Sequence, residues 1–63
     1  MTIFDYLSLR TEWETLTGQE GTIDNMKSFL SECTNWMAGQ LARDPSLRRA
    51  ADIARMCENL NRA

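Results

Sequence analysis

The sequence predicts a small all-α protein, made of three helices that pair into a homodimeric bundle. Two observations lead to this fold class. Apolar residues recur with the 3.6-residue period of an α-helix along three segments, and glycine or proline interrupts the chain between them. The predicted helices span residues 3–17, 23–42 and 45–61, within one domain over residues 1–63. A chain of 63 residues buries only about 60% of its unfolded surface, so its core is marginal.

The first predicted helix begins after Thr2, which can cap it, and ends at Gly18, a residue suited to helix C-termini. One apolar stripe contains Tyr6, Leu9, Trp13 and Leu16. A second group spreads around the other side of the first two turns and consists of Ile3, Phe4 and Leu7. A single neighbouring helix cannot cover both groups.

The second predicted helix has the clearest periodicity and is expected to be the central one. Thr22 or Asp24 caps it. Its apolar face comprises Ile23, Met26, Phe29, Leu30, Cys33, Trp36, Met37 and Leu41. Gly39 costs about 1 kcal/mol relative to alanine inside a helix, which favours early fraying of this end.

The third predicted helix opens with Asp44 as the capping side chain and Pro45 at the first helical position. It carries a face of small residues, Ala50, Ala51 and Ala54, beside a larger apolar face of Ile53, Met56, Cys57 and Leu60. The loops between the helices are short, which predicts that sequential helices run antiparallel.

The apolar faces are wider than a three-helix monomer needs, and this excess favours a homodimer. The residues predicted to form the core or the dimer interface are Ile3, Phe4, Leu7, Trp13, Met26, Leu30, Cys33, Met37, Leu41, Ile53 and Leu60.

The residue inventory argues against an enzyme, a metal site or a bound cofactor. The sequence has no histidine, and Cys33 and Cys57 have no metal-ligand spacing and lie on apolar stripes. The segment Gly18–Gly21 lacks the lysine and upstream strand of a phosphate-binding loop. No catalytic residue is therefore predicted. No run of about 20 apolar residues occurs and no secretory signal precedes the first helix, so we expect no membrane span and a cytoplasmic location.

Charge is distributed unevenly along the chain. Residues 1–42 carry six acids and two bases, whereas residues 43–63 carry five arginines and three acids. Arg48, Arg55 and Arg62 recur along one side of the third helix. This basic ridge is a candidate surface for an acidic protein or for nucleic acid. A solvated face whose arginines pair with neighbouring acids is the simpler interpretation.

Protein binding is the leading functional prediction. Phe29 and Trp36 lie at one edge of the second helix, where aromatic side chains suit a partner interface, and together with the three arginines they form the predicted contact set. In size and residue inventory the chain resembles the small helical proteins with which phages and plasmids disable host machinery, including anti-CRISPR proteins and quorum-sensing antagonists. This resemblance implies an inhibitor or regulator that blocks a protein target sterically. A nucleic-acid-binding regulator is the alternative.

Overall fold

The computed structural model describes residues 2–37 and 39–62, and these residues form four helices with no strand. The helices are α1 (Ile3–Thr17), α2 (Ile23–Asn35), α3 (Gln40–Arg43) and α4 (Pro45–Arg62). The all-α class is confirmed. Three of the helices are long, and α3 is a single turn between α2 and α4. The ends of the predicted domain, residues 1 and 63, lie outside the described residues, as does residue 38.

The capping signals read from the sequence are confirmed at both ends of α1 and at the starts of α2 and α4. Thr2 and Asp5 form a capping box at the start of α1, and the bond from the Thr2 backbone N–H to Asp5 lowers the pKa of that carboxyl. Gly18 ends α1 in the left-handed conformation, with φ of 69°. Thr22 caps α2. Asp44 accepts hydrogen bonds from the backbone N–H groups of Ser46 and Leu47 at the start of α4.

The prediction of one continuous helix over residues 23–42 is wrong. The backbone N–H of Trp36 bonds to the carbonyls of both Glu32 and Cys33, which tightens the last turn of α2. Gly39 then lies outside any helix, with φ of −123° and ψ of −70°, before the single turn of α3 begins. Gly39, a residue of low helix propensity, therefore lies in the break between α2 and α3 and not in a frayed helix end.

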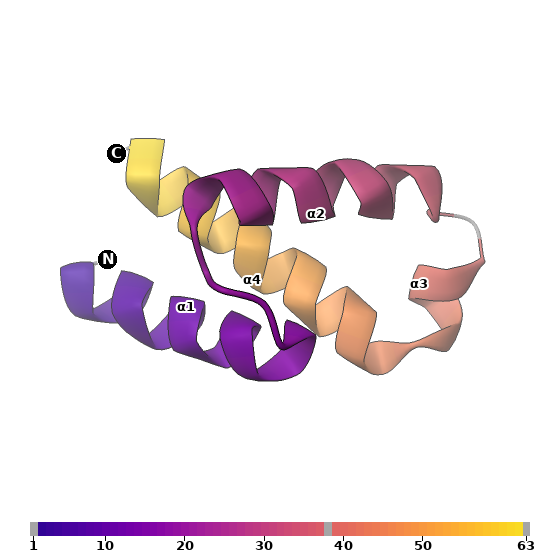
Figure 1. Ribbon diagram of the computed structural model, residues 1–63, viewed down its shortest axis with the longest axis horizontal. Coiled ribbons are helices and arrows are strands. Elements are labelled where there is room, and N and C mark those ends of the chain that lie inside the picture. The colour runs from indigo at the N-terminus through magenta and orange to yellow at the C-terminus, as the bar shows by residue number, and fades with distance from the viewer. Residues whose placement is uncertain (1, 38, 63) are drawn as a thin grey trace.

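The central helix is α4, which corrects the expectation that residues 23–42 form the spine. α4 packs against α1, α2 and α3, and its most extensive contacts are with α1 (Figure 1). The alanine face permits this close approach on several sides: Ala50, Ala51 and Ala54 are all buried. α1 and α2 meet chiefly through an edge-to-face contact between Trp13 and Phe29, whose ring centroids are 5.8 Å apart.

The expected antiparallel arrangement of sequential helices fails between α1 and α2. Both run from left to right in Figure 1, and α4 returns in the opposite direction. The connecting segment folds back along α1, because the Gly21 N–H donates to the Glu14 carboxylate at 2.8 Å and Gly21 lies against Arg10. A Cβ at position 21 would lie only 2.5 Å from Cγ of Arg10, so this return path depends on glycine.

Candidate functional site

Exposed apolar side chains gather at the start of α1. Phe4 is 74% exposed, Ile3 66% and Leu7 45%. Helical spacing places Phe4 and Leu7 on the side opposite the buried Trp13, in line with three small polar residues. We call this set the outer strip. It consists of Phe4, Leu7, Ser8, Thr11 and Thr15, all of them exposed.

The threonines of the outer strip have their hydroxyl protons engaged within the helix. Thr11 donates to the carbonyl of Leu7 at 2.9 Å, and Thr15 donates to the carbonyl of Thr11 at 3.1 Å. With these hydroxyls turned toward the backbone, the side chains can present their methyl groups. The strip is therefore small and largely apolar over its second half.

The outer strip contains no charged residue, and the acids of α1 beside it already have partners within the chain. Glu12 binds Arg49 of α4 through two hydrogen bonds of 2.9 and 3.3 Å. Glu14 accepts from Gly21, and Asp5 belongs to the N-terminal cap. The charges flanking the strip thus serve the fold, and the strip itself offers a neutral surface.

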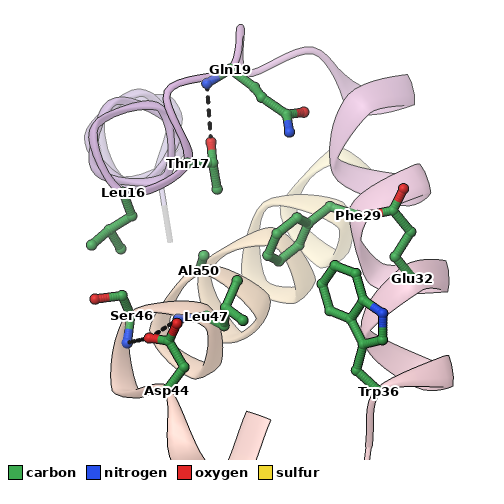
Figure 2. A pocket seen from close by; sticks show the side chains of 10 residues that line it. All are labelled: Leu16, Thr17, Gln19, Phe29, Glu32, Trp36, Asp44, Ser46, Leu47 and Ala50. Atoms are coloured by element: carbon green, nitrogen blue, oxygen red, sulfur yellow. Dashed lines mark hydrogen bonds between the residues drawn. The ribbon is translucent and has the colours of Figure 1, made fainter. Parts of the chain in front are cut away.

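A pocket of about 280 Å³ lies where the ends of α1 and α2 approach the start of α4 (Figure 2). We call it the end pocket. The rings of Phe29 and Trp36 line the α2 side, while Leu16 lies across from them on α1. Leu47 and Ala50 of α4 lie between these walls. The polar lining residues are Thr17, Gln19, Glu32, Asp44 and Ser46.

A second hollow, of about 200 Å³, lies between α2, α3 and α4. Its lining is Leu30, Cys33, Thr34, Met37, Leu41, Ala51, Arg55 and Glu58. Met37 is 66% exposed at this site, whereas Leu30 and Leu41 are half-buried. Arg55 and Glu58 carry opposite charges, so this hollow has no strong preference for a charged ligand.

The arginine ridge of α4 is largely paired with acids of the same helix. Arg55 lies 3.6 Å from Asp52, and Arg62 hydrogen-bonds to Glu58. Within the described residues Arg48 has no ion pair. The simpler interpretation of this ridge, a solvated face with internal pairs, therefore describes two of its three arginines.

The predicted contact residues do not form one surface. Phe29 is buried at 6% exposure in the core, so its ring reaches solvent only through the end pocket that it shares with the half-buried Trp36. Arg48, Arg55 and Arg62 lie on α4 and line no part of that pocket. Gln19, Asp44 and Ser46 also line the end pocket, but they lie in the segment after α1, at the cap of α4 and in its first turn, outside the apolar period of the sequence.

The predicted core and interface residues fall into three groups. Trp13, Met26, Cys33 and Ile53 are buried. Leu30, Leu41 and Leu60 are half-buried. Ile3, Phe4, Leu7 and Met37 are exposed and take no part in the core of this chain. Ile3, Phe4 and Leu7 of this group lie at the start of α1 and form the apolar surface that remains for a second molecule, whereas Met37 lines the hollow between α2, α3 and α4.

Cys33 and Cys57 are free and buried, and burial raises the pKa of each thiol. Folding therefore favours the neutral thiols, and this contribution is complete below the ordinary thiol pKa of 9.0. It is lost as the pH rises through the raised pKa of the folded state. Thiolate chemistry near neutral pH is correspondingly disfavoured.

We therefore expect the urea midpoint, measured by circular dichroism under reducing conditions, to fall as the pH rises above about 9. A Cys33→Ala/Cys57→Ala variant should lose less stability over the same range, because it lacks the two thiols whose raised pKa couples folding to pH. An equal loss in the two proteins would show that the thiols are not responsible.

The described residues contain neither a membrane-spanning helix nor a metal-binding cluster. In the described part of the chain, no helix is both long and apolar enough to cross a membrane, and no group of three or more His, Cys, Asp or Glu residues could hold a metal ion. Comparison with known proteins gives no assignment: no family model, curated protein or solved structure matches this chain.

Proposed function

We propose that this chain is a small, non-enzymatic protein-interaction module that works as a homodimer and inhibits or regulates a target protein by steric occlusion. The observation that carries the proposal is the outer strip of α1, together with the adjoining Ile3. Phe4, at the N-terminal end of the strip, is 74% exposed. An apolar surface of this kind on a small domain is characteristic of a contact with another protein.

The neutrality of the outer strip favours self-association. A twofold interface places each surface against its own copy, so any net charge on the strip would repel itself. Here the nearby charges of Glu12 and Glu14 are satisfied within the chain, and the strip adds none. Two copies can therefore meet without desolvating an unpaired charge.

The shape of the outer strip favours an antiparallel pair of α1 helices. Its first half carries the large side chains of Phe4 and Leu7, and its second half carries the small side chains of Thr11 and Thr15. In an antiparallel pair, the large end of one helix faces the small end of the other. This arrangement fills the space between the helices as close packing requires.

The available area indicates weak association. Ile3, Phe4 and Leu7 together leave roughly 300–400 Å² of apolar surface, the size of a typical functional patch. Two such patches with the threonine methyls approach the ~1,000 Å² of a specific interface. We therefore expect a dimer that forms at micromolar concentration or above.

Sedimentation velocity tests this surface with a Phe4→Glu variant. In the antiparallel pair Phe4 faces the threonine end of the partner's strip, where a carboxylate would lose its solvation against apolar groups, so the dimer dissociation constant should rise by tenfold or more. The folding stability of the monomer should change by less than about 0.5 kcal/mol, because Phe4 is exposed.

Met37→Glu is the matched control, since Met37 is an equally exposed apolar side chain far from the strip along the chain. It should leave the dimer unchanged. A parent protein that sediments as a 7.2 kDa monomer at high micromolar concentration would overturn the dimer. If the monomeric parent nevertheless retains a protein from its host that Phe4→Glu does not, the strip serves a different partner.

The nucleic-acid alternative has less support. Phosphates would compete with Asp52 for Arg55 and with Glu58 for Arg62. The aromatic side chains that could stack on bases are also poorly placed, because Phe29 and Trp36 line the end pocket and the arginine ridge does not.

A further inference from the structure

The end pocket lies at the C-terminal ends of two helices. Leu16 and Thr17 belong to the last turn of α1, and Glu32 belongs to the last turn of α2. The carbonyl groups at a helix C-terminus carry a partial negative charge, and a basic side chain in the last turn usually offsets it. Neither α1 nor α2 has a basic residue in its last turn. Two helix ends whose negative partial charge has no basic side chain beside it therefore border one pocket.

The remaining charges around the end pocket have the same sign. Among the ten lining residues, Glu32 and Asp44 are acidic and none is basic. The positive end of α4 also borders the pocket, but the Asp44 carboxylate accepts from its Ser46 and Leu47 N–H groups and offsets that partial charge. The electrostatic environment thus favours a cation.

Aromatic walls provide an independent preference of the same kind. The rings of Trp36 and Phe29 line one side of the pocket, and tryptophan is the side chain that attracts cations most strongly through its ring (Figure 2). Guanidinium groups also stack on such rings. The hydroxyl of Thr17 already donates to the carbonyl of Trp13 and accepts from the Gln19 N–H, so the carboxylates of Glu32 and Asp44 are the charged groups that the lining offers a ligand. Acceptors of this type suit a ligand that carries only donors.

The size of the end pocket restricts the ligand to a single side chain. Sites for cofactors and drug-sized molecules occupy roughly 300–1,000 Å³. A pocket of about 280 Å³ that is open to solvent lies at or below the lower end of that range. One arginine side chain fits this space, with its stem against Leu16 and Leu47 and its planar head against Trp36.

We propose that the end pocket binds an arginine side chain presented by a partner protein. This inference rests on the proposed function, because the arginine would belong to the target protein proposed there. It names the side chain by which that target is recognised. The pocket and the outer strip are separate surfaces, so a target could occupy the pocket while α1 pairs with a second copy.

Two-dimensional ¹⁵N NMR with N-acetyl-argininamide as the probe tests the pocket directly. We expect saturable shifts of the Trp36 indole N–H and the Gln19 amide at millimolar probe concentration, weakening as salt is added. The citrulline analogue has the same shape without the charge and should give no saturable shift. The lysine analogue should bind more weakly, because it lacks the planar head.

Glu32→Gln should weaken the probe at least about threefold while keeping the shape of the pocket. Asp24→Asn is the matched control, because it removes the same charge from the first turn of α2 and should leave the affinity unchanged. Well-dispersed spectra will establish that each variant is folded. Equal shifts from citrulline, undiminished binding to Glu32→Gln, or no saturable shift from the arginine probe would each overturn the proposal.

This experiment does not depend on the dimer. A monomeric parent that binds the arginine probe would overturn the dimer and support the pocket. A dimeric parent that does not bind the probe would support the dimer and overturn the pocket.

Discussion

Replacing Trp13 with alanine is expected to remove about 3–5 kcal/mol of folding stability, the loss typical of deleting a buried aromatic side chain. Trp13 is fully buried and joins α1 to α2 through its contact with Phe29. A domain of this length is stable by roughly 3–9 kcal/mol in total, so the variant should be largely unfolded at room temperature or close to it. Urea unfolding followed by circular dichroism at 222 nm measures the loss.

Two companion variants sharpen this prediction. Phe4→Ala deletes an aromatic ring of similar size from an exposed position and should cost less than about 0.5 kcal/mol in the monomer. Trp13→Phe should cost much less than Trp13→Ala, because Nε1 of Trp13 is buried without a hydrogen-bond partner among the described residues, and phenylalanine removes that unsatisfied donor. A cooperative transition within 1 kcal/mol of the parent for Trp13→Ala would contradict the assigned core.

The second large effect is expected at Ala54, where leucine should destabilise the fold by about 3 kcal/mol. Ala54 is fully buried on the helix that packs against all the others, so added methylene groups must displace a neighbouring helix. The same urea experiment measures this loss.

Ala42→Leu is the matched control, because Ala42 is an exposed helical alanine and should tolerate leucine with little change. A urea midpoint for Ala54→Leu equal to that of the parent would contradict the tight packing around Ala54.

The helix ends could be predicted because their signals are local. Thr2, Gly18 and Asp44 act within their own turns, through a capping hydroxyl, a left-handed backbone and a capping carboxylate. The end of α2 was harder to place, because the apolar period continues through Met37 and Leu41 after the helix has ended. Periodicity reports which side chains are apolar, but it does not report that the backbone has turned.

The topology depends on contacts between segments far apart in sequence, and the pattern therefore could not give it. The direction of α2 follows from Gly21 packing on Arg10 and bonding to Glu14, and a short glycine-rich loop resembles an ordinary hairpin turn in sequence. The central position of α4 follows from its alanines, which mark a surface for close packing on more than one side. Gly21 and the alanines of α4 are visible in the sequence, but the helices that they contact are known only from the structure.

Of the two candidate surfaces, one could be predicted from the sequence and the other could not. The exposed group at the start of α1 could be predicted, because Ile3, Phe4 and Leu7 lie away from the stripe that contains Trp13. The end pocket could not, since it combines residues from the ends of three helices and the segment after α1. Its aromatic side chains were recognised, but the arginines grouped with them lie on a different surface.

The central place of α4 has a consequence for how the protein is made. α4 follows α1 and α2 along the chain, yet both of these helices make most of their contacts with it. A nascent chain that ends before residue 45 has no scaffold on which its apolar faces can be buried. Folding must therefore wait until α4 has been synthesised, and until then the earlier helices remain open to proteases and chaperones.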